Sequence, residues 1–341
     1  MKKARIGLIG TGFMGRAHSS CYVMDSRVEL AAVSSLEGDR GQEFIREFGF
    51  ERFSNDWMSL IEDGSIAIID ITAPNFLHAE IAIAAFKAGK AVIMEKPLAL
   101  SMEEADRVMD AARHHHTLAM YAENRRFAPV FNQCRSIIEK GEIGDVRIFR
   151  INEMGSGPGH SGWFRDIKKA GGGALIDLGI HGLGLAEWLV GSSIIKVSAM
   201  RSPADGMDET VVTLCRFQSG ALGQFVCSWG IQGGLDIRAE IFGSQGTLIV
   251  DHSKTVNGLM TYRSEATAGD PNRPHQASTS GWSFPPVDEW NVKGHRQEIR
   301  HFVDCYLDGV PCHSTFETGY RALQLARAIY RAAAEGREIT L

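Results

Sequence analysis

The first third of the chain alternates short apolar runs with longer amphipathic segments. The apolar runs predict strands at 4–9, 28–33, 66–71, 91–94 and 118–121. The segments between them have helical spacing and predict helices at 13–23, 39–48, 78–88 and 101–113. The run at 66–71 is almost entirely apolar, which is typical of a strand buried on both faces. This alternation predicts βαβ units and therefore an α/β domain built on a doubly wound parallel sheet.

The remaining two thirds have a different pattern. Helices are predicted at 129–140, 175–189, 289–307 and 315–334, with a strand at 146–152 and long loops at 154–173 and 263–287. Strand patterns at 195–202, 210–217, 221–229, 236–242 and 247–251 follow one another without intervening helices. Such spacing predicts an open, mainly antiparallel sheet. The sequence therefore predicts two domains, 1–123 and 124–341, the second also of the α/β class.

Composition excludes several classes of protein. A length of 341 residues suits two domains, and a hydrophobic fraction of 44% excludes a largely disordered chain. With 36 basic and 41 acidic residues the net charge is -5, so neither nucleic acid nor a membrane surface is an expected partner. No apolar stretch reaches the roughly 18 residues that cross a bilayer. The six cysteines form no C-x-x-C pair, which favours reduced thiols in a cytoplasmic protein.

A glycine-rich motif follows the first predicted strand. Gly10-Thr11-Gly12-Phe13-Met14-Gly15 has the spacing G-x-G-x-x-G and leads from a strand into a helix. In that context the first glycine makes a tight turn, the second admits a pyrophosphate, and the third lets helix and strand pack closely. The motif predicts a Rossmann dinucleotide-binding domain at 1–123, with Gly10, Gly12, Phe13, Met14 and Gly15 at the cofactor.

The end of the second predicted strand bears on the choice of cofactor. Domains that bind NAD usually carry Asp or Glu about 20 residues after the glycines, where it bonds the ribose. This chain has Ser34 and Ser35 there and Arg40 shortly after. Hydroxyls and a guanidinium suit a 2′-phosphate, so we expect NADP to bind at least as well as NAD. Two alternatives favour NAD instead. Glu37 lies near enough to bond the ribose, and Arg40 could be only an exposed residue of the helix.

Two more motifs follow predicted strands: Ala73-Pro74-Asn75 with His78, and Glu95-Lys96-Pro97. They are therefore expected at the carboxyl edge of the sheet, where open α/β sheets bind ligands. A lysine beside a nicotinamide ring can donate a hydrogen bond to a substrate oxygen. These motifs add the following expected cofactor contacts: Ala73, Pro74, Asn75, His78, Glu95, Lys96 and Pro97.

Together these segments resemble the glucose–fructose oxidoreductase and inositol dehydrogenase (Gfo/Idh/MocA) family. The resemblance rests on G-x-G-x-x-G, on A-P-N…H at 73–78, on G-K-A-V-I-M-E-K-P-L-A at 89–99 and on G-G-G-A-L-I-D-L-G-I-H at 171–181. The end of the chain, 315–341, is similar as well. The resemblance covers nearly the whole chain and implies that 124–341 binds substrate and forms a homodimer or homotetramer through its sheet.

The resemblance also implies the catalytic residues. In the family the lysine of E-K-P and the aspartate and histidine of D-x-G-x-H meet at the reactive ring of the cofactor, and here they are Lys96, Asp177 and His181. We expect His181 to exchange the proton, because an unperturbed imidazole titrates near neutral pH. Lys96 would then stabilise charge on the substrate oxygen, and Asp177 would hold a neighbouring hydroxyl. Gly184 departs from the family, which often carries Asp there.

Other candidates are weaker. Asn124 and Arg126 lie in N-R-R-F, which is similar to a family stretch; we expect the first at the cofactor and the second at the substrate. His160, Trp163 and Arg165 precede the glycine run and are expected to contact substrate, with Trp163 offering a flat face for a sugar ring. A Trp163 packed into the fold is an equal alternative. The sequence shows no ligand cluster with metal spacing, so no metal is expected.

The leading hypothesis is an NAD(P)-dependent oxidoreductase that transfers a hydride between nicotinamide C4 and a hydroxyl or keto carbon of a sugar, polyol or sugar derivative. One alternative is an NAD-dependent glycosidase of the same family, which oxidises its sugar transiently and eliminates the aglycone. Another is a non-enzymatic dinucleotide-sensing regulator. Lys96, Asp177 and His181 argue against the regulator.

Overall fold

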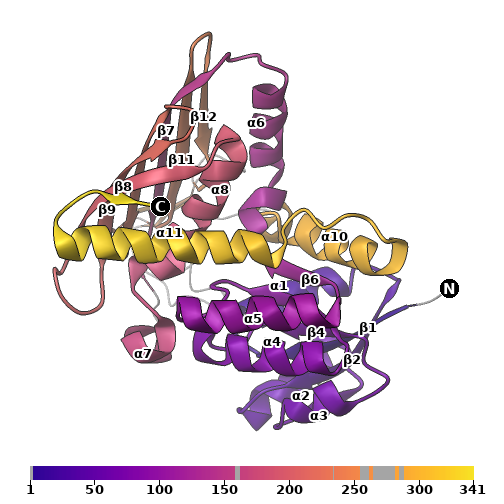
Figure 1. Ribbon diagram of the computed structural model, residues 1–341. Coiled ribbons are helices and arrows are strands. Elements are labelled where there is room, and N and C mark those ends of the chain that lie inside the picture. Colours follow the sequence, from indigo (N-terminus) through magenta and orange to yellow (C-terminus); the bar gives the residue numbers. More distant parts are fainter. Residues whose placement is uncertain (1–2, 158–161, 233, 254–260, 264–280, 284–287) are drawn as a thin grey trace. The chain divides into compact units, whose positions relative to one another are not determined.

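The structure is a computed structural model that describes residues 3–157, 162–232, 234–253, 261–263, 281–283 and 288–341 (Figure 1). The chain forms two compact units, and each contains segments from distant parts of the sequence. The first unit comprises Met1–Phe127 and Gly294–Tyr320, and the second comprises Ala128–Lys293 and Arg321–Leu341. The segment 294–320, which the sequence predicts in the second domain, thus packs with the first.

The first unit is a six-stranded parallel sheet in the order β3-β2-β1-β4-β5-β6. Its strands are β1 (Ala4–Ile9), β2 (Val28–Ser34), β3 (Arg52–Ser54), β4 (Ile68–Ile71), β5 (Ala91–Glu95) and β6 (Ala119–Ala122). Its helices are α1 (Phe13–Tyr22), α2 (Gly38–Phe48), α3 (Met58–Glu62), η1 (Asn75–Leu77), α4 (His78–Lys87), α5 (Met102–His115), η2 (Asn124–Phe127) and α10 (His295–Asp308). The parallel doubly wound prediction is confirmed; the short β3 and α3 were not predicted.

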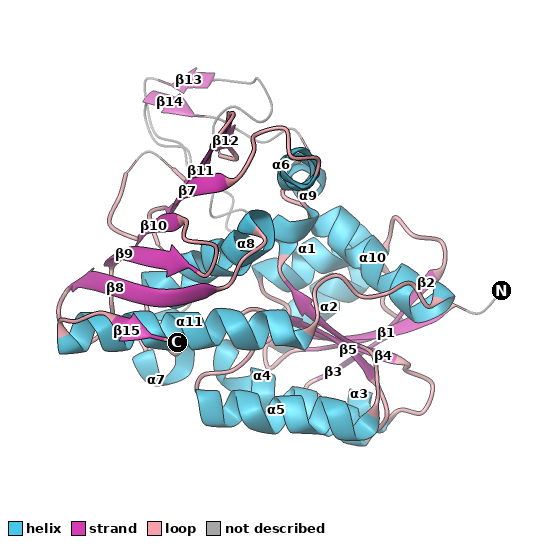
Figure 2. Cartoon of the chain, turned by 45° about the horizontal axis from the view of Figure 1, so that its top comes forward, coloured by secondary structure: helices cyan, strands magenta, loops and turns pink. Residues whose placement is uncertain are grey.

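The core of this unit lies between the sheet and helices on its two faces. Every residue of β4 and β5 is buried, because α1 and α10 cover one face and α4 and α5 the other (Figure 2). Reciprocal hydrogen bonds cap the start of α5: the Ser101 hydroxyl accepts from Glu104 N at 3.2 Å, and the Glu104 carboxylate accepts from Leu100 N at 2.9 Å. Gly89 follows α4 with a φ of 72°, as a helix-ending glycine does.

The second unit is built on a seven-stranded mixed sheet in the order β12-β11-β7-β10-β9-β8-β15. Its strands are β7 (Val146–Met154), β8 (Ile194–Ser202), β9 (Thr210–Phe217), β10 (Leu222–Ser228), β11 (Asp236–Gly243), β12 (Thr247–Asp251) and β15 (Ile339–Thr340), with a separate pair β13 (Thr261–Arg263) and β14 (Gly281–Ser283). Its helices are α6 (Pro129–Glu139), η3 (Gly162–Arg165), α7 (Ile167–Ala170), η4 (Leu175–Gly179), α8 (Ile180–Val190) and α9 (Glu289–Val292). The long helix α11 (Phe316–Glu335) begins in the first unit and ends in the second.

The structure differs in several details from the prediction for 124–341. The predicted loop 154–173 contains η3 and α7, and the predicted loop 263–287 contains β14. The pair β7–β10 is parallel, because the chain between them makes a long excursion through α8. The helix predicted at 289–307 is interrupted at Gly294, whose φ of 92° separates α9 from α10. The helix predicted at 175–189 begins with a π-turn, η4, before α8. The predicted loop 263–287 lies mostly outside the described residues.

One helical run in this unit is long and apolar enough to cross a membrane, judged by length and composition alone. The sequence analysis expected no such segment. It covers Ile167–Val190, and 67% of its most apolar 18-residue window is buried. η4 and α8 within this run pack on β7 and β10. The burial identifies the run as the core helix of this unit.

The other face of the seven-stranded sheet carries several exposed apolar side chains beside polar ones such as Arg150 and Gln224. Outward positions of neighbouring strands pair directly, Met200 with Val212 and Leu222 with Ile148. Leu214 lies beside Gln224 in the same row and is 60% exposed. β9 alternates strictly between buried and exposed residues along this stretch. Within the described residues, helices cover one side of this sheet and leave these apolar side chains exposed.

Candidate functional site

The glycine-rich turn after β1 contacts the loop after β4. Gly10 has a φ of 113°, and a Cβ there would collide with the carbonyl of Thr72. The Thr72 hydroxyl donates to the Gly10 carbonyl at 2.9 Å. By contrast, a Cβ on Gly12 would meet nothing within 4 Å. The chain thus closes tightly around Gly10 and leaves open space beside Gly12, at the point between β1 and β4 where the strand order reverses.

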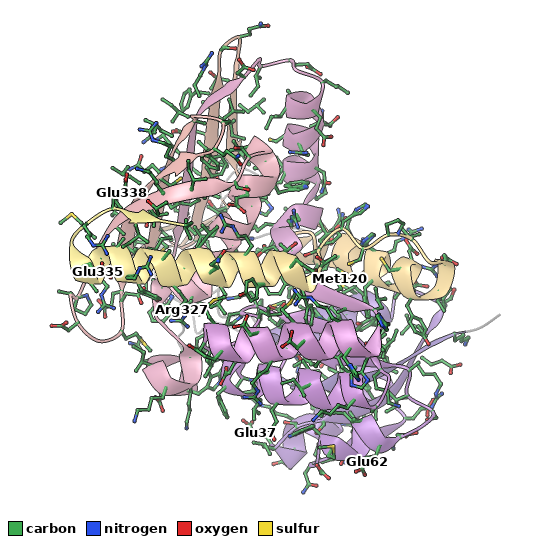
Figure 3. The ribbon with its side chains drawn as sticks, in the orientation of Figure 1. Glu37, Glu62, Met120, Arg327, Glu335 and Glu338 are labelled. Atoms are coloured by element: carbon green, nitrogen blue, oxygen red, sulfur yellow. The ribbon has the colours of Figure 1, made fainter. Side chains whose placement is uncertain are left out.

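At the end of β2 the predicted 2′-phosphate residues have different surroundings. Ser34 is buried, whereas the Ser35 hydroxyl accepts from Thr11 Oγ1 at 2.7 Å and from the backbone N–H of Glu37 at 3.1 Å. Arg40 Nε lies 2.7 Å from the Glu37 carboxylate, and both side chains are more than half exposed. Glu37 lies at the surface of the first unit (Figure 3). Ser35 therefore connects the Gly-rich turn to the segment that carries Glu37 and Arg40.

The motifs after β4 and β5 are joined by His78. Its Nε2 lies 2.8 Å from the carbonyl of Ala73, and its Nδ1 lies 2.7 Å from the carbonyl of Pro97. Burial lowers the pKa of His78, although the two carbonyls oppose that effect. The next turn is fixed internally, because the backbone N–H of Lys96 donates to the Glu95 carboxylate at 3.0 Å. His78, predicted at the cofactor, thus lies between the two loops of the carboxyl edge.

Behind this edge lies a buried network centred on His18 of α1. Its Nδ1 lies 2.9 Å from one oxygen of Asp70 in β4, and its Nε2 lies 3.4 Å from the carboxylate of Glu95. Burial alone would lower the pKa of His18, but the two carboxylates raise it well above its usual value. His18 is therefore an imidazolium at neutral pH. Its charge holds together the helix after the Gly-rich turn, the central strand β4 and the E-K-P turn.

Glu298 of α10 is the fourth ionisable member of this region. One of its carboxylate oxygens lies within 4.8 Å of both His18 and a ring nitrogen of His295. The residue is fully buried, and neither oxygen has a hydrogen-bond partner among the described residues. Burial raises the pKa of Glu298 well above its usual value; His18 opposes this, and Glu95 reinforces it. Glu298 is thus a carboxyl group that folding favours in its neutral form.

In the second unit, Asp177 and His181 lie within the core helix, where η4 leads into α8. Asp177 is in the π-turn η4, and His181 lies one residue into α8 and is 9% exposed. The indole N–H of Trp229, just after β10, donates to Asp177 Oδ2 at 3.0 Å. π-turns within α-helices occur frequently at functional sites. The structure thus places the predicted aspartate and histidine on one helical segment, and Trp229 fixes the carboxylate.

The glycine run before this helix is held by Asp208, which the sequence did not single out. The buried Asp208 carboxylate accepts from the backbone N–H of Gly173 at 2.8 Å and of Leu175 at 2.9 Å. Tyr330 OH donates to the same carboxylate at 2.6 Å. A Cβ on Gly173 would collide with the Asp208 carbonyl. Asp208 therefore satisfies the first amides of the helix that carries Asp177.

The weaker candidates occupy separate places. Asn124 and Arg126 lie in η2 of the first unit, where Arg126 donates to Thr318 Oγ1 at 2.8 Å. In the second unit, Trp163 stacks on Phe164 with ring centroids 4.0 Å apart, and Arg165 is exposed. His160 lies outside the described residues. Lys96 belongs to the first unit, and Asp177 and His181 to the second.

The structure brings together a cluster that the sequence analysis did not single out. His301, Cys305 and Cys312 place their ligand atoms within 4.8 Å of one another. The spacing H-x3-C-x6-C was the available signal, because its first two members are one helical turn apart. All six cysteines of the chain are free thiols, as the composition predicted.

Comparison with known proteins agrees with this geometry. The model of an oxidoreductase family with an NAD-binding Rossmann fold matches residues 4–123, and the model of the GFO/IDH/MocA C-terminal domain matches residues 131–249. The chain is 29% identical to levoglucosan dehydrogenase from Pseudarthrobacter phenanthrenivorans, over 98% of this chain and 97% of that protein. It is also 29% identical to myo-inositol 2-dehydrogenase from Thermotoga maritima, over 99% and 98% of the two chains.

Solved structures extend the likeness to three dimensions. GenD2 from gentamicin A biosynthesis, in complex with NAD, superposes with a TM-score of 0.91 at 29% identity, over 100% of this chain and 97% of that one. Levoglucosan dehydrogenase in complex with NADH and levoglucosan gives 0.83 at 29% identity, over 99% of both. Fold and site thus define a nicotinamide-dependent oxidoreductase with a Rossmann domain. The chain belongs to the Gfo/Idh/MocA family.

The buried carboxyl group of Glu298 leads to a prediction about stability. Because folding raises its pKa, the folded state binds a proton more tightly than the unfolded state does. The contribution of Glu298 to stability is therefore greatest below its unfolded pKa, near 4.3, and falls as pH rises toward its folded pKa. Glu298→Gln removes this loss. We compare the free energy of unfolding in urea of the variant with that of the wild type at each pH. This difference should favour the variant by roughly 1–3 kcal/mol more at pH 8 than at pH 5.

Glu62→Gln is the matched control, because it makes the same change at an exposed position of the same unit (Figure 3). It should shift stability equally at both pH values. A Glu298→Gln variant that is destabilised equally at pH 5 and pH 8 would show instead that Glu298 is ionised beside His18.

Proposed function

We propose that this oxidoreductase oxidises a hydroxyl group of a polyol or sugar derivative, or reduces the corresponding ketone, with NAD(H) or NADP(H). The observation that carries the proposal is the Gly-rich turn packed on the loop after β4, with open space beside Gly12 at the switch point of the sheet. The named dehydrogenases among the relatives, which act on levoglucosan and myo-inositol, support a polyhydroxylated ring as substrate.

We propose the following roles for the candidate catalytic residues. A bound nicotinamide supplies the hydride acceptor or donor. His181 takes the hydroxyl proton during oxidation and returns it during reduction. The ammonium of Lys96 donates a hydrogen bond to the same substrate oxygen and stabilises the negative charge that develops there. Asp177, held by Trp229, accepts a hydrogen bond from a neighbouring substrate hydroxyl. Trp163 and Arg165 are proposed to contact the ring farther from the reacting carbon.

The glycosidase and regulator alternatives have less support. The named relatives are dehydrogenases, and both Lys96 and the Asp177/His181 pair are present. A glycosidase of this kind would release an aglycone without net change in reduced cofactor. Absorbance of the reduced nicotinamide with a panel of polyols and sugars therefore distinguishes the two activities.

Lys96→Met is predicted to lower turnover by roughly 10²–10⁴-fold, because it removes the donor to the substrate oxygen while replacing the aliphatic stem with an unbranched chain of similar length. Cofactor affinity, measured by fluorescence titration with NADH and NADPH, should change little. His181→Ala should act similarly and flatten the pH profile of kcat. Asp177→Ala should also raise KM. The exposed Lys87→Met, at the end of α4, is the matched control and should keep turnover. Near-native turnover in Lys96→Met would refute the mechanism.

We propose further that NADP(H) binds at least as well as NAD(H), through Ser35 and Arg40. The Glu37–Arg40 pair is exposed, so the guanidinium can exchange its carboxylate for a 2′-phosphate with little loss. A charge-assisted hydrogen bond contributes roughly 1.5–3 kcal/mol, or one to two decades of affinity. Arg40→Ala should therefore weaken NADPH by about 10–100-fold and leave NADH nearly unchanged. Wild-type protein that binds NADH far more tightly than NADPH would identify Glu37 as the ribose ligand.

We also propose that the exposed apolar face of the seven-stranded sheet joins two or more copies of the chain. Met200, Val212, Leu214, Leu222 and Ile148 lie together on it, and monomers rarely expose such a patch. Leu214→Glu should dissociate the oligomer in light scattering, because it places a charge within that face. Val23→Glu, a half-exposed apolar position outside the sheet, should not. A wild-type monomer at micromolar concentration would contradict this proposal.

A further inference from the structure

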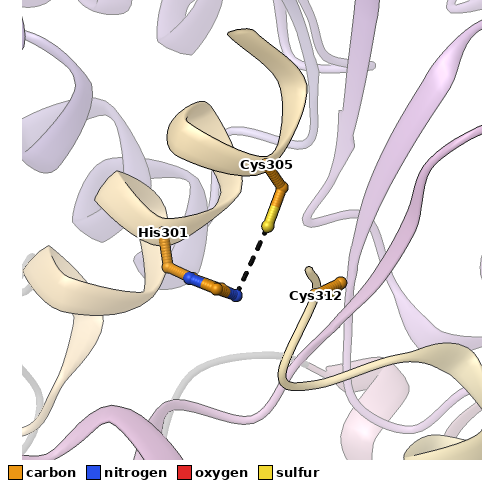
Figure 4. Close-up of side chains that lie close together, drawn as sticks. All are labelled: His301, Cys305 and Cys312. Carbon is orange, nitrogen blue, oxygen red and sulfur yellow. Dashed lines mark hydrogen bonds between the residues drawn. The ribbon is translucent and has the colours of Figure 1, made fainter. Parts of the chain in front are cut away.

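Two cysteines and a histidine converge in the first unit. His301 and Cys305 lie four residues apart on one face of α10, and Cys312 comes from the segment that follows this helix (Figure 4). His301 Nε2 lies 3.3 Å from Cys305 Sγ, and the three ligand atoms lie within 4.8 Å of one another. Cys305 is buried, whereas His301 and Cys312 are partly exposed, so the cluster is reachable from solvent.

The imidazole of His301 is held with its acceptor nitrogen in the cluster. Its Nε2 accepts from the backbone N–H of His313 at 3.1 Å, so the ring proton is on Nδ1. The rings of Phe127 and His313 pack against it, with centroids 5.3 and 4.4 Å away. Burial and the neighbouring His313 lower the pKa of His301. The imidazole is therefore neutral at pH 7, which is the form that coordinates a metal ion.

We propose that His301, Cys305 and Cys312 bind one borderline or soft divalent cation of the zinc type, with water in the fourth position. Two sulfurs and an imidazole nitrogen are the donor set that Zn²⁺ prefers, whereas Mg²⁺ and Ca²⁺ require oxygen. Tetrahedral coordination brings ligand atoms to about 3.5–4 Å from one another, given bond lengths of 2.0–2.3 Å. In the structure the three ligand atoms lie within 4.8 Å of one another, so small side-chain movements would bring them to these distances. Binding would replace the two hydrogen bonds of Nε2 with a coordinate bond.

The two thiols must lose their protons for the metal to bind. Burial raises the pKa of Cys305 to about 12. Burial also raises the pKa of Cys312, although the backbone N–H of Ser314 and the charge of Arg126 favour its thiolate. Each bound cation therefore releases two protons, M²⁺ + 2 RSH giving M(SR)₂ + 2 H⁺. Affinity should consequently increase with pH.

The position of the cluster suggests a structural role. The segment after Cys312 pairs with β6: Tyr121 N donates to the Ser314 carbonyl at 2.8 Å, and Ser314 Oγ donates to the Tyr121 carbonyl at 2.7 Å. Arg126 of η2 donates to the His313 carbonyl at 3.2 Å. A cation here would fasten the end of α10 to the segment that borders β6 and η2. Because the unfolded chain lacks this arrangement, binding should stabilise the folded protein.

The test is titration of the reduced full-length protein with Co²⁺, which reports thiolate ligation by a sulfur-to-cobalt charge-transfer band. The band should saturate at one equivalent, and Zn²⁺ should abolish it. Calorimetry in two buffers should give about two protons released per cation. Cys312→Ser and His301→Gln should each weaken binding at least about tenfold, whereas Cys134→Ser, a buried thiol of α6, should not. Zn²⁺ should raise Tm in the wild type and not in Cys312→Ser.

Three outcomes would overturn the proposal. One is the lack of a charge-transfer band in folded, reduced wild-type protein. Another is a band that persists in Cys312→Ser, which would place the metal elsewhere. The third is a Cys305–Cys312 disulfide that re-forms in air after reduction and prevents Co²⁺ from binding, which would make the pair redox-active instead. Circular dichroism of each variant establishes that it is folded.

Discussion

The charged imidazole of His18 is the interaction on which the first unit depends. It lies between two buried carboxylates, at 2.9 Å from Asp70 and 3.4 Å from Glu95. A buried ion pair of this kind contributes little net stability, but removing one partner leaves an uncompensated charge. The network therefore links α1, β4 and β5 through one side chain. The Gly-rich turn and the E-K-P turn lie at the ends of these elements.

Asp208 has the corresponding role in the second unit. Its carboxylate accepts from two amides at the start of the helix that carries Asp177 and His181, and Tyr330 from α11 completes the arrangement. The close approach of Asp208 explains the glycine at position 173, which has no room for a side chain. In the first unit the His18 imidazole from α1 contacts the Glu95 carboxylate beside Lys96. In the second unit the Asp208 carboxylate, from a distant part of the chain, holds the start of the segment that carries Asp177 and His181.

The sequence predicts the elements whose pattern is local. Strands β1, β2, β4 and β5 end beside their expected motifs, and the spacing of Ser101 and Glu104 caps the start of α5. Features decided by distant contacts were not predictable. The parallel pairing of β7 with β10 joins strands that are far apart in the sequence, and Asp208 has no local signature that marks it as a cap. Likewise, the positions of Lys96, Asp177 and His181 were inferred from resemblance, whereas Trp229 became visible only through its contact with Asp177.

The central claim is that this chain moves a hydride between a polyhydroxylated substrate and a nicotinamide. The most direct measurement uses a polyol deuterated at its carbinol carbons, incubated with the protein and NAD⁺ or NADP⁺, with mass spectrometry of the cofactor. The account predicts that one deuterium appears at C4 of the reduced nicotinamide, together with a stoichiometric amount of ketone. Release of an aglycone with no net reduced cofactor, or no deuterium transfer from any substrate in a broad panel of polyols and sugars, would contradict it.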